Sequence, residues 1–119
     1  VYGVDISEYA IANAKKEVKK YCRVANAVDL PFDDNSIDVV ISITTLHNLE
    51  ENDLRIALLE IERVAKRGSF ITLDAYRDDN EKDRMEAWNL TAKTVMRVDQ
   101  WKEFFADVGY SGDYNWFIP

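Results

Sequence analysis

Four polar residues able to form hydrogen bonds or accept protons follow one apolar stretch of the sequence. Ile37–Ile43 is rich in β-branched residues with almost no alternation, and Thr44, Thr45, His47 and Asn48 follow it. A run of this kind is typical of a central parallel strand that is buried on both faces. Ligands of open α/β sheets bind at the carboxyl ends of such strands. We therefore expect these hydroxyl, imidazole and amide groups to lie at a ligand-binding edge.

A carboxylate ends another apolar stretch, at the beginning of the sequence. Val1–Asp5 predicts a buried strand, and Ser7 suits the N-cap of a helix that runs to Lys20 or Tyr21. One carboxylate can accept hydrogen bonds from the two neighbouring hydroxyls of a ribose at such a strand end. Alternatively, Asp5 begins a loop and its negative charge stabilises the helix N-terminus. The residues alone leave both interpretations open.

The elements that must position these groups alternate along the chain between strands and helices. Pro31 fixes its own φ and keeps Leu30 out of the helical region, so a turn is expected before Ile37–Ile43. Gly68 and Gly109 are expected to end the helices that precede them. The expected elements, in chain order, are a strand over 1–5, a helix from 7 to about 20, strands over 21–25 and 37–43, a helix over 50–67, a strand over 69–75, helices over 81–93 and 99–108, and a late strand within 110–119. This alternation predicts parallel pairing with right-handed crossovers, and therefore an α/β fold.

Composition and charge exclude several classes of function. The chain has 119 residues, enough for one domain, and a net charge of −7, which argues against a phosphate backbone or an anionic membrane as partner. Cys22 is the only cysteine and His47 the only histidine, so we expect no disulfide within the chain and no metal site. No apolar run is long enough to span a membrane and no signal-peptide pattern is visible, so we expect a cytoplasmic protein.

Three segments, taken in order, resemble the class I S-adenosylmethionine-dependent methyltransferases. They are Val4–Ser7, Asn26–Phe32 and Ser36–Leu49. In that family a strand ends in Asp followed by a hydrophobic residue and Ser, then comes D-A-x-x-L-P-F, and then S-F-D-x-V-x-S-x-x-x-L-H with His or Asn after it. The likeness is to the small-molecule group that includes the ubiquinone-biosynthesis C-methyltransferases, and it covers nearly the whole chain. It implies a Rossmann-like sheet, mostly parallel with a late antiparallel strand, and one partial methyltransferase domain over residues 1–119.

The resemblance also implies a set of contacts with S-adenosylmethionine. Asp5 would bind the ribose hydroxyls, and Ile6 would pack on the adenine ring. Asn26 stands where the family usually has an aspartate that accepts from the adenine amino group, so the same bond would lack charge assistance. Ala27 would offer its backbone N–H to an adenine ring nitrogen, and Phe32 would border the same pocket.

At the other end of the cofactor, the resemblance implies that Ser42, Ile43 and Thr44 line the methionine portion. Leu46 and His47 would then face the acceptor. His47 is the candidate catalytic residue, because an imidazole can accept a proton near neutral pH. The alternative, and the commoner role for such a residue, is packing or hydrogen bonding at the start of a helix.

One departure from the family concerns the glycines. The family's first strand and Gly-rich loop precede the strand that carries the ribose-binding acid, whereas this sequence has four glycines, none in G-x-G spacing, and nothing before Val1. In the family's sheet the missing strand lies between Val1–Asp5 and Ile37–Ile43, so an apolar sheet edge would stay unpaired. Either the chain is a fragment, or another chain supplies the strand, or the sheet is rearranged; we expect the first. The N-terminal strand and helix are therefore expected to be absent, and residues 1–119 alone to bind S-adenosylmethionine poorly.

We expect the full-length protein to transfer methyl groups from S-adenosylmethionine to a small-molecule acceptor, without a nucleic-acid or membrane partner and with a homodimer as one form of assembly. Tyr76–Val98 and the aromatic tail would select the acceptor. One alternative is a truncated, non-catalytic module that pairs or swaps strands with another chain. Another is a nucleotide-dependent oxidoreductase, whose Gly-rich loop would also lie upstream. The Leu30–Phe32 and Leu46–Asn48 segments favour methyl transfer, because dinucleotide enzymes do not require them.

Overall fold

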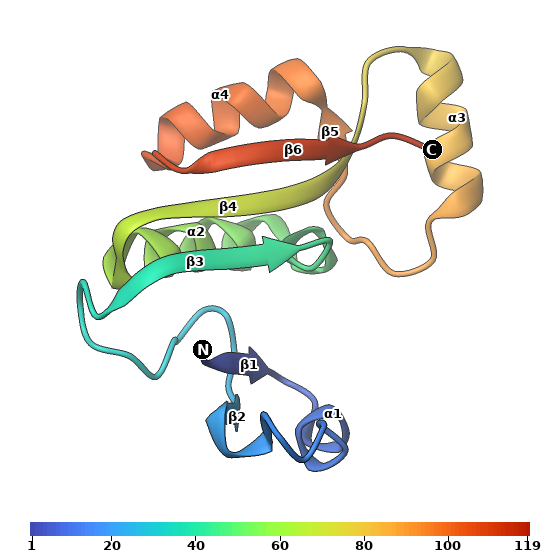
Figure 1. The fold of residues 1–119 in the computed structure, drawn as a ribbon. Coiled ribbons are helices and arrows are strands. Elements are labelled where there is room, and N and C mark those ends of the chain that lie inside the picture. Colours follow the sequence, from blue (N-terminus) through green and yellow to red (C-terminus); the bar gives the residue numbers. More distant parts are fainter.

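The computed structural model describes all 119 residues and shows an α/β fold whose strands form two separate sheets (Figure 1). The strands are β1 (Gly3–Asp5), β2 (Cys22–Val24), β3 (Ile37–Ile43), β4 (Ala65–Tyr76), β5 (Met96–Arg97) and β6 (Asp113–Phe117). The helices are α1 (Glu8–Ala12), α2 (Glu51–Val64), α3 (Asp79–Trp88) and α4 (Val98–Val108), with short 3₁₀ helices η1 (Lys19–Tyr21) and η2 (Leu46–Asn48). None of these helices is both long and apolar enough to cross a lipid bilayer. The α/β class predicted from the sequence is confirmed.

The pairing of the strands confirms the mostly parallel sheet but corrects the prediction for the last strand. β1 and β2 pair only with each other, whereas β3, β5 and β6 all pair with β4, and every pair is parallel. The expected late antiparallel strand is therefore wrong: β6 runs parallel to β4, with Phe70 opposite Asp113 and Asp74 opposite Phe117. The connection explains this result. α4 returns the chain to the end of the sheet at which β4 starts, and a strand entering there runs parallel to β4 (Figure 1).

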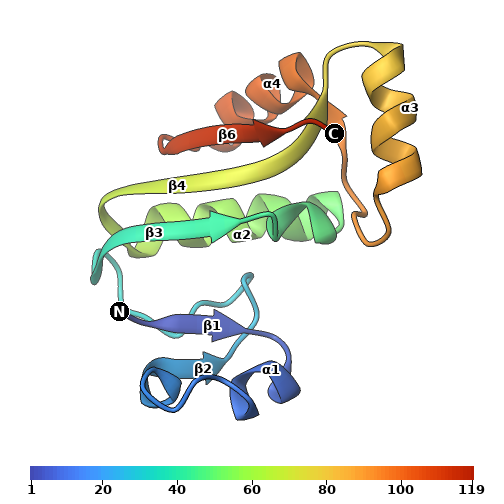
Figure 2. The same ribbon diagram turned by 45° about the vertical axis from the view of Figure 1, so that its right-hand side comes forward.

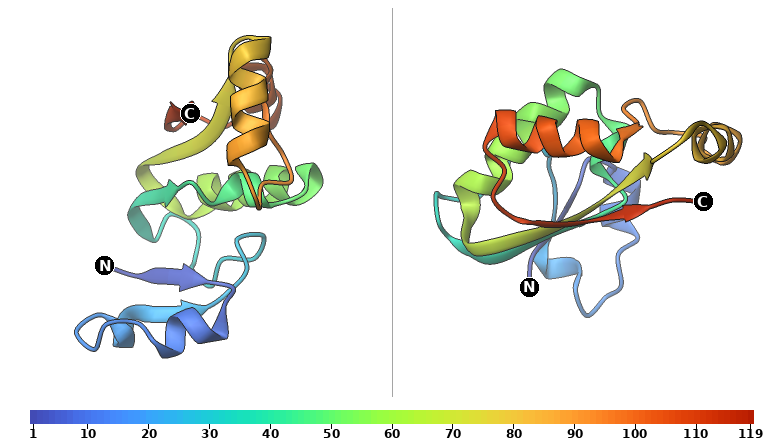
Figure 3. Two further views of the ribbon diagram at one scale, coloured as in Figure 1. Left: turned by 90° about the vertical axis from the view of Figure 1, so that its right-hand side faces the viewer. Right: turned by 90° about the horizontal axis from the view of Figure 1, so that it is seen from above.

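The core lies between the larger sheet and two helices on one of its faces, α2 and α4 (Figure 3, right). Apolar residues recur every three or four positions in α2, which gives this helix one buried stripe. Trp101 of α4 is fully buried, as are Ile71 and Leu73 of β4. These side chains fix α2 and α4 against β4, so the carboxyl end of β4 has a rigid support.

Three helix boundaries differ from the prediction. α1 ends at Ala12 rather than near residue 20, because none of its residues is buried and no packing compensates for ordering further turns. α2 ends at Val64, and the next residue already pairs with β3, so Gly68 lies inside β4 opposite Val39 instead of ending the helix. α3 ends at Trp88, short of the expected Lys93.

β3 is less buried than the sequence indicates. Its apolar run predicts cover on both faces, but Val39, Ile41 and Ile43 are 53%, 65% and 51% exposed. Val40, on the opposite face, packs against the core. That prediction is therefore wrong for this chain, because α2 covers one face of β3 and nothing covers the other.

The two sheets are separated at the place where the resemblance puts a missing strand. β1 lies beside β3 but is not paired with it (Figures 1 and 2). A pocket of about 530 Å³ occupies this region, and nine of its eleven lining residues are hydrophobic, among them Tyr2, Phe32 and Ile41. The expected break between the two strands is thus present, with apolar side chains on both sides of it.

We predict that the exposed side chains on the uncovered face of β3 bind apolar dyes but contribute little to the free energy of unfolding. In the 119-residue chain, Ile41→Lys should reduce the fluorescence of the dye ANS and change the free energy of unfolding by less than about 1 kcal/mol, because the side chain is already largely exposed. The matched control on the neighbouring strand, Ile71→Ala, should cost about 2–5 kcal/mol, since Ile71 is fully buried. Equal destabilisation by the two substitutions in a urea titration would contradict this description of the sheet.

Candidate functional site

The predicted cofactor residues other than Phe32 lie at or just after the carboxyl ends of strands, but in two groups. Asp5 ends β1, and its carbonyl oxygen accepts from the Ala25 N–H at 3.0 Å, which brings Asn26 beside it at the edge of the smaller sheet. Ser42 and Thr44 lie at the end of β3, in the larger sheet. Because β1 and β3 are not paired, no strand contact holds the two groups together.

The carboxylate of Asp5 is oriented by the loop that follows it. Its Oδ1 accepts from the Ser7 N–H at 2.8 Å, and the Ser7 hydroxyl accepts from the Ala10 N–H at 3.1 Å as the N-cap of α1. Asp5 and Ile6 are both exposed, and Oδ2 of Asp5 makes no hydrogen bond within the chain. One oxygen therefore supports the loop while the other is available to a ligand, so both interpretations made from the sequence are compatible with this geometry.

Asn26 begins a tight turn in the loop after β2. Its Oδ1 accepts from the Val28 N–H at 3.2 Å, and its carbonyl oxygen accepts from the Asp29 N–H at 2.9 Å. Asn26 is exposed, whereas Ala27 is half-buried against the core. Phe32 lies further along, with its ring 5.7 Å from that of Tyr2 in the apolar pocket. These positions place an amide, a backbone N–H and an aromatic ring in one continuous segment.

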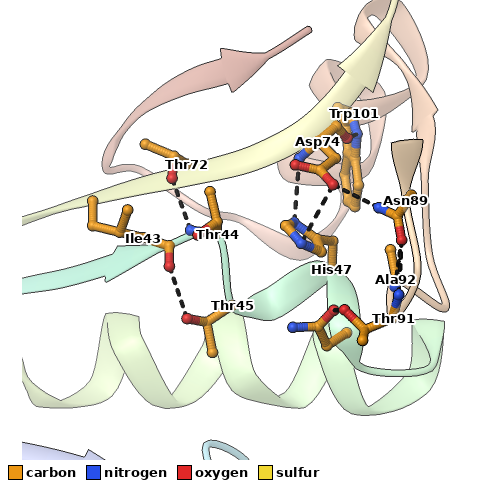
Figure 4. Close-up of polar contacts among 11 residues, drawn as sticks. Ile43, Thr44, Thr45, His47, Thr72, Asp74, Asn89, Thr91, Ala92 and Trp101 are labelled. Atoms are coloured by element: carbon orange, nitrogen blue, oxygen red, sulfur yellow. Dashed lines mark hydrogen bonds and ion pairs between the residues drawn. The ribbon is translucent and has the colours of Figure 1, made fainter. Parts of the chain in front are cut away.

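Thr44 adopts an unusual backbone conformation at the end of β3. Its φ is 49°, in the left-handed region, which is rare for a β-branched residue. The Thr44 N–H donates to both the hydroxyl and the carbonyl oxygen of Thr72 on β4, at 2.8 and 3.2 Å (Figure 4). The Thr45 hydroxyl donates to the Ile43 carbonyl at 2.9 Å. Bonds from the neighbouring strand thus hold the strained turn that leads into η2.

His47 is 4% exposed and is held by Asp74 of β4 (Figure 4). The Asp74 N–H donates to His47 Nδ1 at 3.2 Å, and His47 Nε2 lies 3.5 Å from Asp74 Oδ2. The Asn89 amide donates to the same carboxylate oxygen at 2.7 Å, and the Trp101 indole N–H donates to the Asp74 carbonyl at 3.1 Å. Asp74 is fully buried, and its Oδ1 has no partner. Asp74 was not predicted from the sequence, although a carboxylate near the end of an apolar strand is the same signal that singled out Asp5.

The hydrogen bonds of His47 determine which of its nitrogens carries the proton. Nδ1 accepts from a backbone N–H, so in the neutral ring the proton resides on Nε2, facing the carboxylate of Asp74. Burial lowers the pKa of His47, and the nearby charge of Asp74 opposes part of this effect. Burial also raises the pKa of Asp74. Nδ1 accepts a backbone hydrogen bond and Nε2 faces the Asp74 carboxylate at ion-pair distance, which favours the hydrogen-bonding role; the catalytic role of His47 stays a prediction.

The aromatic residues in and near the expected acceptor segments are divided between the core and the surface. Trp101 is fully buried, and Tyr114 and Trp116 pack on Phe105 with ring centroids 5.0 and 5.9 Å apart. Trp88 is exposed and lies 4.7 Å from the ring of Phe117. A second pocket, of about 280 Å³, lies between α3 and the loop after it, and its lining residues are Tyr76, Lys82, Met85, Glu86, Asn89, Leu90, Ala92 and Val95. Asn89 connects this pocket to the cluster around Asp74.

Comparison with known proteins gives a consistent result. A family model described as "Methyltransferase domain" matches residues 1–73. The chain is 32% identical over its whole length to a 2-phytyl-1,4-naphtoquinone methyltransferase of Trichormus variabilis, and covers 52% of that protein. It is 34% identical, over 66% of its length, to a tRNA (carboxymethyluridine(34)-5-O)-methyltransferase of Arabidopsis thaliana, and covers 19% of it.

A solved structure is similar in fold as well as in sequence. It is a methyltransferase chain from a complex with the Haloferax volcanii Trm112 methyltransferase activator, with a TM-score of 0.68 and 25% identity over 91% of the present chain. The chain covers 49% of that structure, and it also spans 49% of a 32% identical uncharacterised protein of Haemophilus influenzae. The chain thus spans about half the length of the relatives that it matches over most of its own length.

We predict that His47 titrates below the usual value near 6.5 and that its neutral imidazole carries the proton on Nε2. Because His47 is the only histidine, its ring nitrogens give one unambiguous set of ¹⁵N NMR signals. The lowered pKa places protonation below the usual value near 6.5, and Asp74→Asn should lower it further by removing the one neighbouring charge that raises it. Since the unfolded chain binds a proton near pH 6.5 and the folded ring only at a lower pH, His47 should reduce stability as the pH falls below 6.5. Titration of the ring at or above pH 6.5, or a proton on Nδ1 of the neutral ring, would contradict this assignment.

Proposed function

Because the chain belongs to the methyltransferase domain family, as a class I S-adenosylmethionine-dependent methyltransferase, we propose that the full-length protein transfers a methyl group from S-adenosylmethionine to a small-molecule acceptor. The observation that carries this proposal is the carboxylate of Asp5, at the end of β1, with one oxygen held by the Ser7 N–H and the other available. Such a carboxylate suits two neighbouring ribose hydroxyls at the edge where the parallel strands end.

The segment after β2 suits the adenine portion of the cofactor. Asn26 and Ala27 lie next to Asp5, and we assign them the adenine amino group and a ring nitrogen, through the side-chain oxygen and the backbone N–H respectively. Ile6 is exposed beside Asp5 and would pack on the ring. We also assign Phe32 to the border of this site; its ring lines the apolar pocket next to β3, which Asp5, Ile6, Asn26 and Ala27 do not line. The residues present therefore fit the adenosine half of the cofactor.

The methionine half is supported by fewer groups of this chain. We assign Ser42, Ile43 and Thr44 to it, because they lie at the carboxyl end of β3 and Thr44 is fixed in position by Thr72. When bound, S-adenosylmethionine supplies an already activated methyl group, so the protein mainly has to align the acceptor with it. In this scheme His47 positions η2 through Asp74, and its candidate role as a proton acceptor requires that it first leave the Asp74 N–H.

The nature of the acceptor is supported by one relative and by charge. The Trichormus variabilis relative is named for a quinone, which is a small molecule. The net charge of −7 is unfavourable for a phosphate backbone. A tRNA acceptor is the second candidate, because the Arabidopsis thaliana relative is named for one.

Assembly with a second polypeptide is the competing proposal for the exposed sheet. The similar Haloferax volcanii structure was solved with the Trm112 activator, and the unpaired, apolar edge of β3 would suit a strand from another chain or from a second copy of this one. A non-catalytic module that pairs strands would have the same edge, so activity must be measured together with the oligomeric state.

We predict that Asp5→Asn weakens binding of S-adenosylmethionine by the full-length protein roughly 10- to 100-fold, the usual cost of losing a charged hydrogen-bond partner. Asn26→Asp should strengthen binding by supplying the charge that the amide lacks. The matched control is Asp33→Asn, which changes an exposed acid in the turn before β3. Calorimetric titration measures the affinity, and transfer of a labelled methyl group from S-adenosylmethionine measures activity.

We also predict that residues 1–119 alone bind S-adenosylmethionine poorly or not at all, because β1 and β3 are not joined into one sheet. Micromolar binding by this polypeptide in a calorimetric titration would refute this expectation.

For the Asp5 prediction, the contradicting outcome is that the full-length Asp5→Asn variant binds S-adenosylmethionine as tightly as the unsubstituted protein does. That result would overturn the assignment of Asp5.

A further inference from the structure

Two residues of α2 hold an irregular segment that lies about thirty positions earlier in the chain. The Leu30 N–H donates to Glu60 Oε2 at 2.8 Å, and the Leu30 carbonyl accepts from Arg63 Nη2 at 3.0 Å. The Arg63 carbonyl in turn accepts from the Asn35 N–H at 2.9 Å. Both backbone groups of Leu30 are thus bonded to α2 side chains, as they would be to a neighbouring strand.

The guanidinium of Arg63 uses all five of its N–H groups in these contacts. Nε donates to Glu60 Oε1 at 2.7 Å and Nη2 to Glu60 Oε2 at 2.9 Å. Nη1 donates to the Phe32 carbonyl and to the Asp34 carboxylate, both at 2.8 Å, and Nη2 also bonds the Leu30 carbonyl. An arginine fork can supply five donors in fixed directions, which an ammonium group cannot.

The bonded segment has no regular structure of its own. The Phe32 N–H donates to the Leu30 carbonyl at 2.9 Å, which closes a three-residue turn around Pro31. The Pro31 carbonyl accepts from the Arg23 guanidinium at 3.3 Å. Apart from the buried side chain of Leu30, the turn is held in place mainly by hydrogen bonds from other elements. Its position relative to the larger sheet is therefore set by α2.

The location of this turn gives the contacts a functional meaning. Asn26 and Ala27 precede it, Phe32 ends it, and all three are assigned above to the adenine portion of the cofactor. α2, by contrast, is fixed in the core by Leu58 and Ile61 on either side of Glu60. Since β1 and β2 do not pair with the larger sheet, Glu60 and Arg63 provide hydrogen bonds that join the cofactor segment to it.

We propose that Glu60 and Arg63 are positioning residues of the cofactor site, which bind the backbone of Leu30–Asp34 and thereby fix Asn26, Ala27 and Phe32 relative to β3. This inference rests on the function proposed above. Glu60 and Arg63 form more than a surface ion pair. Three of the five hydrogen bonds that Arg63 donates go to oxygens of Leu30–Asp34 and only two go to Glu60. The hydrogen bonds from Arg63 also lower the pKa of Glu60, so the carboxylate remains charged at neutral pH.

Hydrogen exchange in the full-length protein without cofactor tests the contacts directly. Arg63→Lys should speed exchange of the amides in residues 28–36 about tenfold or more, because a lysine cannot replace the forked donors. Glu60→Gln should speed exchange of the Leu30 amide less than Arg63→Lys does, since an amide oxygen can still accept the hydrogen bond from the Leu30 N–H. The control is Arg67→Lys near the start of β4, whose guanidinium is 74% exposed and makes one contact of 3.9 Å, to Asp38. Unchanged exchange in Arg63→Lys would overturn the proposal.

Enzyme kinetics tests whether the contacts serve the cofactor. Arg63→Lys should raise the KM for S-adenosylmethionine about tenfold and leave kcat within about twofold, while Arg67→Lys changes neither. Faster exchange with an unchanged KM would show that the pair only stabilises the turn, and would overturn the positioning role. If the unsubstituted protein transferred no methyl group from S-adenosylmethionine to any acceptor tested, the proposed function would fail, and the positioning role with it. Faster exchange in Arg63→Lys would in that case still confirm that Arg63 holds the turn, so a wrong function could be told apart from wrong contacts.

Discussion

The positions of the candidate residues at the end of β3 and in η2 depend on the backbone of one strand, β4. Its twelve residues pair with β3, β5 and β6, and α2 and α4 cover one of its faces. The Asp74 N–H and carbonyl bond His47 and Trp101, and the Thr72 carbonyl and hydroxyl hold Thr44. These are largely main-chain bonds from a buried strand, so the end of β3 and the start of η2 are as rigid as the core itself. The residues that we assign to the acceptor side are therefore held by contacts within residues 1–119.

The cofactor side depends on a weaker connection. β1 and β2 form a small sheet that does not pair with β3. The apolar pocket between this sheet and β3 is lined by hydrophobic residues next to β1 and by residues of β3 itself. The contacts of Glu60 and Arg63 with Leu30–Asp34 add polar links across this break. These hydrogen bonds, together with the packing of Leu30 and Phe32, join the segment that we assign to the adenosine half of the cofactor to the larger sheet.

The sequence predicted the features that depend on local periodicity and on strand ends. The helices α2 and α4, the strands β3 and β4, the parallel pairing and the placement of Asp5 and Thr44 at carboxyl edges all follow from such patterns. The burial of β3 was overestimated, since an apolar run shows what a strand could bury and not what is present to cover it. Glu60 and Arg63 were missed because they bond backbone atoms 30 to 33 residues away, and no spacing in the sequence reveals such pairs. Asp74 was missed although it lies near the end of an apolar strand, because its side-chain partners, His47 and Asn89, are distant in the sequence. The direction of β6 depended on the return path of α4, which the resemblance alone did not describe correctly.

The way in which α2 holds the turn around Pro31 has a consequence for how such a site can evolve. Glu60 and Arg63 bond main-chain atoms: the N–H and carbonyl of Leu30 and the carbonyl of Phe32. Every amino acid has a carbonyl at position 32, and every amino acid except proline has an N–H at position 30. The shape of the loop is thus largely uncoupled from the chemistry of the side chain at position 32. Substitutions at position 32 can therefore change the wall of the adjacent apolar pocket while the backbone of the loop keeps its place.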